Sequence, residues 1–282
     1  MSPAYWDIFF FTLWVFLLLY GRILNKTAYI FYTGLSYATN YKNPNTDNRY
    51  DLNMEHAFAN HMSHLHAPLE KMGYKVSCSI ITNKNDNPNY KRTTRLYNAK
   101  ELPYEDVPYK ETVHAAEQWF DFRYQRFLAM GWGYGMQGAR LLTIPEIPKA
   151  DIYLFVRCDL KLKKPLDELN IKYDKINYMW KEEEAHRQNW CGYYKTKIDK
   201  SSHPRSAWNL HRRVGGNMLN VVAFKYIKAF VEFYWMEHCA LLAMLRASDY
   251  ITLDDVHFMC GDEMYDSGVF KGENPIFSHF RI

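Results

Sequence analysis

The sequence has few cysteines and little net charge, and each absence excludes a class of protein. Its five cysteines are widely spaced and form no CxxC pair. We therefore expect reduced thiols in a cytosolic setting, with neither a disulfide framework nor a zinc site. The 35 basic and 31 acidic residues give a net charge of only +4. Because no large positive field results, we expect no nucleic-acid partner.

Aromatic residues are abundant instead, at 17% of the 282 residues, and charged residues make up 23%. This composition excludes a disordered or low-complexity chain and is typical of a globular protein. The length suffices to bury a full core. We expect an α/β fold in which residues 25–282 form a single domain.

One long apolar run stands near the N-terminus, at residues 8–20 (IFFFTLWVFLLLY). A helix that spans a bilayer core requires about 20 apolar residues, and this run is shorter. No small-residue cleavage site follows it, which makes a removable signal peptide less favoured. We therefore interpret residues 1–24 as a hydrophobic helix that anchors the chain in a membrane or lies in its interface. A buried helix of a soluble cytoplasmic protein is the alternative. Arg22 and Lys26 follow the run and no basic residue precedes it, which predicts that the remaining chain is cytoplasmic.

Three further apolar segments predict the strands of a Rossmann-like mixed sheet flanked by helices. Residues 27–37 (TAYIFYTGLSY) and 74–82 (YKVSCSIIT) are two of them, and residues 151–164 (DIYLFVRCDLKLKK) begin as a buried strand and end abruptly charged. Residues 51–72 have apolar side chains at spacings of three and four, which predicts a helix between the first two strands. Strand, helix and strand in this order open a parallel sheet.

Small or polar residues stand where each predicted strand ends. Because the carboxyl ends of parallel strands share one edge, we expect them to lie together, at the edge where open α/β sheets bind ligands. These residues are Thr33, Gly34, Thr82, Asn83, Arg157 and Asp159. A carboxylate such as Asp159 can hold Mg²⁺ or Mn²⁺ against a diphosphate.

Three glycines within residues 133–138 match the dinucleotide-binding pattern GxGxxG. That pattern requires a strand directly before the first glycine, and the preceding residues read as a helix instead. We interpret these glycines as the end or bend of a helix beside the sheet. In that position Arg123, Gln137 or Arg140 would reach the strand ends.

Two other segments contain reactive or aromatic side chains without a matching pattern. The helix at 51–72 carries four histidines, but no two have the HExxH spacing, so we interpret them as surface or loosely packed residues. Residues 172–211 are rich in Trp, Tyr, Lys and Glu without clear periodicity. They predict an irregular segment that binds substrate or packs over the core.

Carboxylates are concentrated after a long predicted helix at residues 224–246. Asp254, Asp255 and Asp262 are the members of this group that we consider for a catalytic base. Transfer of a sugar from a nucleotide-sugar needs such a base when the configuration at the sugar carbon inverts. It also needs a positively charged group that stabilises the departing diphosphate.

Four segments together resemble glycosyltransferases of large DNA viruses of algae, the chlorovirus group, and related bacterial polysaccharide transferases. They are TAYIFYTGLSY (27–37), HMSHLHAPLEKMGYKVSCSIIT (61–82), DIYLFVRCDLKL (151–162) and GENPIFSHFR (272–281). The resemblance extends over most of residues 27–282 and each motif is short.

The resemblance implies a fold of the GT-A type and an enzyme that transfers a sugar from a UDP- or GDP-sugar to a glycan or glycoprotein acceptor. It places Asp159 where the aspartate of a DxD-like motif binds Mn²⁺ or Mg²⁺ and the donor diphosphate. Here the motif reads Arg157-Cys158-Asp159.

Two other functions are compatible with the sequence. The first is a Rossmann-type enzyme that uses the glycines of 133–138 to bind NAD(P) or S-adenosylmethionine. The second is a non-catalytic, membrane-tethered protein in which Arg157 and Asp159 form only a salt bridge.

Overall fold

The computed structural model is described below for the residues whose placement is defined. These are 26–34, 36–42, 49–82, 84, 87–104, 140–179, 181–183, 213–215, 219–234, 241, 244–245, 250–259, 264–265 and 277–279. Within these ranges, no helix is both long and apolar enough to cross a membrane. The predicted hydrophobic helix at residues 1–24 lies outside the described residues, and the predicted division into an anchor and one domain stays a prediction.

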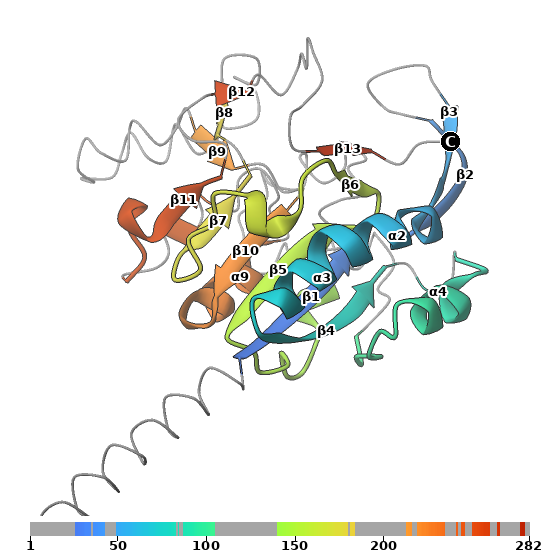
Figure 1. Ribbon diagram of the computed structural model, residues 1–282, viewed down its shortest axis with the longest axis horizontal. Helices are drawn as coiled ribbons and strands as arrows, with labels where there is room; N and C mark the ends of the chain where they lie inside the picture. The colour runs from blue at the N-terminus through green and yellow to red at the C-terminus, as the bar shows by residue number, and fades with distance from the viewer. Residues whose placement is uncertain are drawn as a thin grey trace, which may run out of the picture.

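A six-stranded sheet, in the order β11-β7-β10-β5-β1-β4, forms the centre of the described structure (Figure 1). One half of it consists of β1 (Lys26–Thr33), β4 (Tyr74–Ile81) and β5 (Ile152–Arg157), which are parallel neighbours. The three apolar segments predicted these strands, and the prediction is confirmed. Strand β5 is buried on both faces, as expected for a parallel strand covered by two layers.

The other half of the sheet contains the one strand that runs in the opposite direction. Strand β10 (Leu219–Ala223) pairs antiparallel with β5 and with β7 (Ile176–Tyr178), and β11 (Val256–Phe258) runs parallel to β7. Strands β7 and β11 have only three residues each. A mixed sheet results, as predicted from the sequence.

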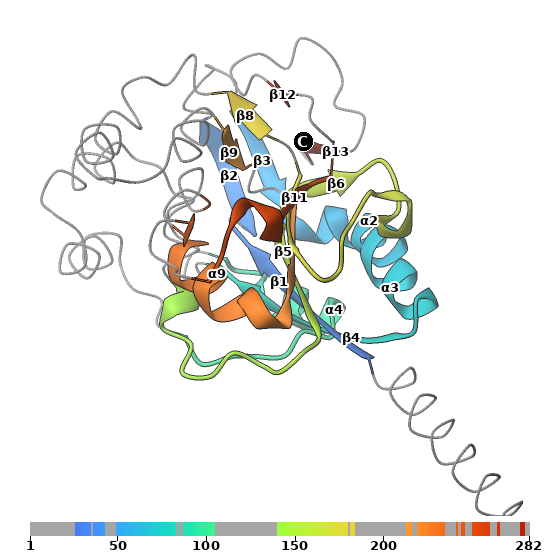
Figure 2. The same ribbon diagram turned by 90° about the vertical axis from the view of Figure 1, so that its left-hand side faces the viewer.

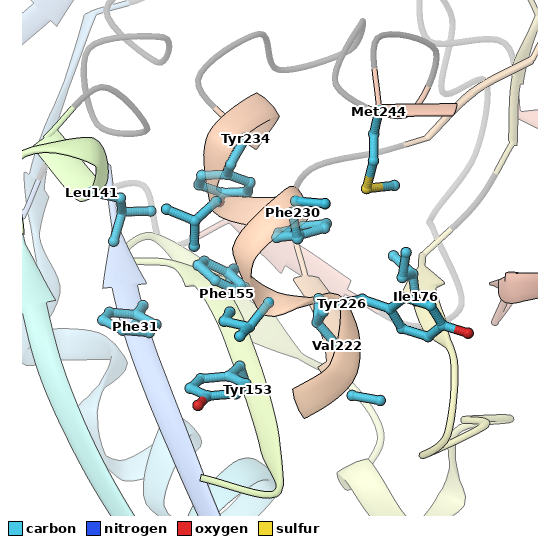
Figure 3. Packing of buried hydrophobic residues seen from close by; sticks show 14 of the residues in the cluster. Phe31, Leu141, Tyr153, Phe155, Ile176, Val222, Tyr226, Phe230, Tyr234 and Met244 are labelled. Carbon is cyan, nitrogen blue, oxygen red and sulfur yellow. The ribbon is translucent and has the colours of Figure 1, made fainter. Parts of the chain in front are cut away.

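Helix α9 (Ile227–Tyr234) covers one face of the sheet and follows a 3-10 turn, η7 (Phe224–Tyr226). Phe155 stacks on Phe31 at 5.2 Å between ring centroids, and on the helix Phe230 and Tyr234 lie 4.8 and 4.9 Å from Phe155 (Figure 3). Because alternate residues of a strand face opposite sides, this face takes the odd-numbered residues of β1 and β5. The predicted helix at 224–246 is confirmed over these described turns.

A second helical layer covers the opposite face of the sheet (Figure 2). It runs without a break through η1 (Met54–Ala57), α2 (Phe58–His61), η2 (Met62–His66) and α3 (Ala67–Lys71). Pro68 has no backbone N–H to bond the residue four positions before it. The preceding turn, η2, is widened to π-helical spacing, with the Ala67 N–H bonded to the Met62 carbonyl.

Shorter elements complete the described structure. They are β2 (Tyr37–Lys42) with β3 (Arg49–Asn53), β6 (Leu160–Leu162) with β13 (Phe277–His279), β8 (Lys181–Glu183) between β12 (Met264–Tyr265) and β9 (Arg213–Gly215), helix α4 (Tyr90–Leu96), and the 3-10 turns η4 (Leu166–Glu168) and η9 (Leu253–Asp255).

Two of the sequence-based expectations need correction. The helix begins after Asn53, whose side chain caps it, and residues 49–53 form β3 instead of its first turn. The segment 172–211, expected to be irregular, contains β7 and β8. Short strands of this kind are fixed by their neighbours in the sheet, because three residues carry too little periodicity to be recognised.

Candidate functional site

The carboxyl ends of β1, β4 and β5 meet at one edge of the sheet, as predicted. Thr33 is level with Ile81 of β4 and with Arg157 of β5. Gly34, Thr82 and Cys158 therefore follow the strands side by side. This edge is where the polar residues predicted from the sequence are brought together.

Gly34 has a backbone conformation that a residue with a side chain rarely adopts, with φ of +103°. The strand ends are tied together around it: the Cys158 N–H donates to the Thr33 carbonyl at 2.8 Å, and the Thr82 hydroxyl donates to the Gly34 carbonyl at 2.8 Å. The glycine thus lets β1 turn sharply at the site edge.

The two predicted threonines are buried within this edge and bond to other protein groups. Thr33 is 2% exposed and its hydroxyl shares a hydrogen bond of 3.0 Å with Tyr234 of α9. Thr82 is fully buried, accepts the Ser36 N–H at 3.2 Å, and its backbone carbonyl accepts the Tyr104 hydroxyl at 2.8 Å. Both threonines therefore fix the strand ends in place.

Arg157 and Asp159 form a two-pronged ion pair beside these strand ends. The Arg157 Nε donates to Asp159 Oδ1 at 2.8 Å, and the second nitrogen donates to Oδ2 at 2.6 Å. The two side chains are 13% and 5% exposed. Such parallel charge-assisted bonds hold a guanidinium and a carboxylate in one plane, so this pair is rigid and largely shielded from water.

The backbone directly after Asp159 is held by the helix on the opposite face. The Asn60 amide donates to the Leu162 carbonyl and accepts the Leu162 N–H, both at 2.8 Å, so it pairs with one edge of β6 as a neighbouring strand would. The backbone of β13 pairs with the other edge (Figure 1). The position of Asp159 is thereby fixed from both sides of β6.

His61 holds the same segment, which corrects the interpretation of the four histidines as surface or loosely packed residues. It is fully buried, its Nε2 lies 2.8 Å from the Leu160 carbonyl, and its Nδ1 lies 2.9 Å from the Tyr97 hydroxyl. Because a carbonyl only accepts, Nε2 carries the proton. Burial lowers the pKa of His61 to about 4, so the ring is neutral at physiological pH. His56 is exposed, while His64 and His66 are half-buried.

Arg140, the third predicted arginine, is buried, with 4% of its surface exposed. Its charge partly offsets the burial that raises the pKa of Tyr104, whose hydroxyl donates to the Thr82 carbonyl. Two further predicted residues, Asn83 and Arg123, lie outside the described residues.

Asp254 and Asp255, two of the three candidates for a catalytic base, do not lie at this edge. They end η9 and precede β11, so they lie at the amino end of a strand parallel to β7. Through the neighbouring strands, Val256 is level with Tyr153 at the start of β5. Arg157 is about 13 Å further along the sheet and about 14 Å across it.

Asp255 has a structural role where it stands. It accepts the Tyr226 hydroxyl, and it closes a capping box by accepting the Thr252 N–H at 2.9 Å. The Tyr226 bond is the main cause that lowers the pKa of Asp255, followed by the Thr252 backbone bond. Asp262, the third candidate base, lies outside the described residues.

A divalent metal would need more ligands than the described part of the chain supplies. Within the described ranges, no three His, Cys, Asp or Glu side chains are grouped so that they could hold a metal ion. Asp159 is the one predicted ligand, and both of its oxygens already accept from Arg157. The described residues therefore do not form a metal site by themselves.

Sequence reasoning missed Asn60, His61 and Tyr104 because their roles depend on contacts distant in sequence. For His61 a signal was present: the buried helix positions Ala57, His61 and Leu65 are four residues apart, which is the spacing of a core-facing row. A histidine at a core position needs partners for both ring nitrogens.

No protein-family model and no curated protein matches the chain. The resemblance to viral and bacterial glycosyltransferases therefore stays a prediction. Among solved structures, the chain is similar to mouse xyloside xylosyltransferase 1 in its apo form, with a TM-score of 0.38 and 10% identity over 83% of this chain and 84% of that one. The described part of the chain has a mixed α/β sheet with flanking helices.

Proposed function

We propose that the protein is a glycosyltransferase that transfers a sugar from a UDP- or GDP-sugar to a hydroxyl of a glycan or glycoprotein. The observation that carries this proposal is the Arg157–Asp159 pair at the carboxyl end of β5, in a mixed α/β sheet. That edge is where open α/β sheets bind nucleotides. The resemblance of four short segments to viral and bacterial glycosyltransferases, noted from the sequence, supports the same class.

Arg157 is the group that we expect to meet the donor diphosphate. A guanidinium has five N–H donors, and two of the Arg157 donors are directed at Asp159. The ion pair holds the plane of the Arg157 guanidinium fixed, which favours recognition of phosphate oxygens by that group. A positive charge placed beside a leaving diphosphate stabilises its negative charge and lowers the barrier to its departure.

A divalent cation is implied by the resemblance, and its place here would be beside Asp159. Mn²⁺ or Mg²⁺ would neutralise diphosphate charge when bound. Since the described residues supply one carboxylate already paired with Arg157, we assign no step to the metal. For the catalytic base, Asp262 remains as a candidate because Asp254 and Asp255 lie at the far edge.

Membrane association through residues 1–24, with the remaining chain cytoplasmic, is retained as a proposal. Strand β1 begins at Lys26, at the edge opposite Arg157. An anchor before Lys26 would therefore attach to the fold away from the proposed donor site. Flotation of the full chain with lipid vesicles, compared with a chain that starts at residue 25, tests this.

A thermal-shift panel tests the proposed function. UDP-glucose, UDP-galactose and GDP-mannose, each with and without Mn²⁺, are compared with NAD and S-adenosylmethionine. A nucleotide-sugar at 100 times its Kd should stabilise the protein by about 2.7 kcal/mol, which raises Tm by about 5 to 10 °C for a chain of this size. No shift with any nucleotide-sugar under any metal condition would contradict the proposal. A shift with NAD or S-adenosylmethionine alone would favour the cofactor enzyme.

A second candidate function is favoured by the geometry of the same pair. A two-pronged, largely buried ion pair at a strand end can also be purely structural, as in a non-catalytic protein. In that case no nucleotide in the panel changes Tm. The ion pair alone would then account for the charged end of β5.

A further inference from the structure

Two buried polar atoms on neighbouring strands have no hydrogen-bond partner within the part of the chain that the structure describes. They are the Tyr178 hydroxyl on β7 and the Asn220 Oδ1 on β10. Both residues are fully buried. A buried polar atom without a partner is unfavourable, and native proteins contain few of them. Two such atoms together therefore require an explanation.

The two residues are direct neighbours in the sheet and face the same side. Asn220 is level with Tyr178 on one side and with Phe155 on the other. Residues level with each other on adjacent strands project from the same face. Phe155 packs against α9, so both orphan groups belong to the α9 face.

This pair of residues lies close to the proposed donor edge. Tyr178 is the last residue of β7, and Phe155 stands two residues before Arg157 on β5. Strand β7 is two strands from β5, about 10 Å across the sheet. That separation is within reach of a sugar whose diphosphate contacts Arg157.

Other buried polar side chains of the same sheet are fully bonded, so the orphans are not a general property of this core. Asn177, next to Tyr178, donates to the carbonyls of Lys172, Lys175 and Val221 and accepts the Lys172 N–H. The Tyr153 hydroxyl accepts the Ala150 N–H and donates to the Pro148 carbonyl, both at 3.0 Å.

We propose that Tyr178 and Asn220 bind one hydroxyl group of the sugar carried by the donor. The tyrosine hydroxyl donates to the oxygen of the sugar hydroxyl, and that hydroxyl donates its own proton to Asn220 Oδ1. A neutral hydroxyl suits the site because both groups are neutral. This inference rests on the proposed function, since it assigns the sugar-recognising part of the same site.

Two further observations agree with this assignment. Burial, and then the nearby Tyr234 hydroxyl, raise the pKa of Tyr178, so it stays a proton donor at any physiological pH. Both orphan atoms are buried in this structure, so the atoms that bury them must move before a hydroxyl can enter. The apparent affinity then includes the cost of that opening.

The competing explanation is a resident buried water that bonds both atoms at all times. The two explanations differ for the protein without ligand. A hydroxyl that is unbonded until ligand arrives can be removed at no loss of stability, whereas removal of a bonded hydroxyl destabilises the protein.

The experiment uses the full chain and the variants Tyr178→Phe and Tyr153→Phe. Both substitutions delete one hydroxyl from a buried ring on the same face of the sheet, and among the described residues only the Tyr153 hydroxyl has hydrogen-bond partners. Tm is measured without ligand, and Kd is measured by calorimetry for UDP and GDP and for UDP-glucose, UDP-galactose and GDP-mannose. Asn220→Leu is a second variant, and its Kd for the same ligands is measured separately.

We expect Tyr178→Phe to keep or raise Tm, and Tyr153→Phe to lower it by about 2 to 4 °C. Tyr178→Phe and Asn220→Leu should weaken binding of a nucleotide-sugar about fivefold and leave binding of the free diphosphate unchanged. A Tm loss in Tyr178→Phe equal to that in Tyr153→Phe would establish the resident water and overturn the inference. Wild-type affinity for nucleotide-sugars in both variants would overturn it while leaving the proposed function intact. A wild-type protein that binds neither diphosphates nor nucleotide-sugars would overturn both.

Discussion

Replacing Asn60 by alanine should loosen the segment that carries Asp159. The amide makes two hydrogen bonds of 2.8 Å to Leu162, and alanine leaves a part-buried N–H and carbonyl of β6 without these partners. With about 1 kcal/mol for each lost bond and a further cost for the unbonded groups, we expect a loss of about 2 to 3 kcal/mol in the free energy of unfolding.

Urea unfolding of the full chain measures this loss, with Ser63→Ala as the matched control. Ser63 lies on the same helix, is exposed, and its hydroxyl bonds only to nearby positions of that helix. Its replacement should change stability by less than about 0.5 kcal/mol. Asn60→Asp should be as harmful as Asn60→Ala at neutral pH, because a carboxylate cannot donate to the Leu162 carbonyl. If Asn60→Ala is no less stable than Ser63→Ala, the Asn60 amide does not hold β6.

Two other predictions concern pH and backbone strain. The pKa of His61 is lowered to about 4 by burial. Since the unfolded chain binds more protons between pH 6.5 and 4, the His61 contribution is fully present above pH 6.5 and falls by about 3 kcal/mol as the pH drops to 4. Urea titrations should show a flatter pH dependence for His61→Gln, with a residual slope from His66; an unchanged slope would refute the assignment. Gly34→Ala should cost about 1 to 3 kcal/mol because of its φ of +103°. Gly34→Asn should cost less, and equal unfolding midpoints for both would contradict the strain.

The part of the fold that could be predicted from sequence is the part coded by long apolar runs. Strands β1, β4 and β5 each contain six to eight residues. Their order and shared edge follow from strand, helix and strand topology. Strands β7 and β11 have three residues each, and their place is set by pairing with the sheet.

This difference explains which predicted positions agree with the structure. Arg157 and Asp159 were located by their position two residues apart at a strand end, and the structure brings them together. Asp254 and Asp255 were identified only as carboxylates that follow the predicted helix at 224–246. They precede a strand, β11, whose direction places them at the opposite edge.

Hydrogen bonds between distant segments could not be read from the sequence. His61 was interpreted as a surface or loosely packed residue, and its ring partners, Leu160 and Tyr97, are 99 and 36 positions away. The same holds for the contact of Asn60 with Leu162. Such partners are set by the packed fold, and no local pattern records them.

The most direct test of the account compares nucleotide-sugar binding to the wild type and to the double variant Arg157→Met/Asp159→Leu by calorimetry. Replacing both members of a buried ion pair by apolar side chains is often neutral for stability. Removing one member leaves a buried charge without its partner and costs about 3 to 5 kcal/mol. The double variant should therefore fold with a Tm close to that of the wild type. The wild type should bind a UDP- or GDP-sugar, and the folded double variant should not. A double variant that binds the nucleotide-sugar as tightly as the wild type would contradict the assignment of Arg157 and Asp159 to the donor site.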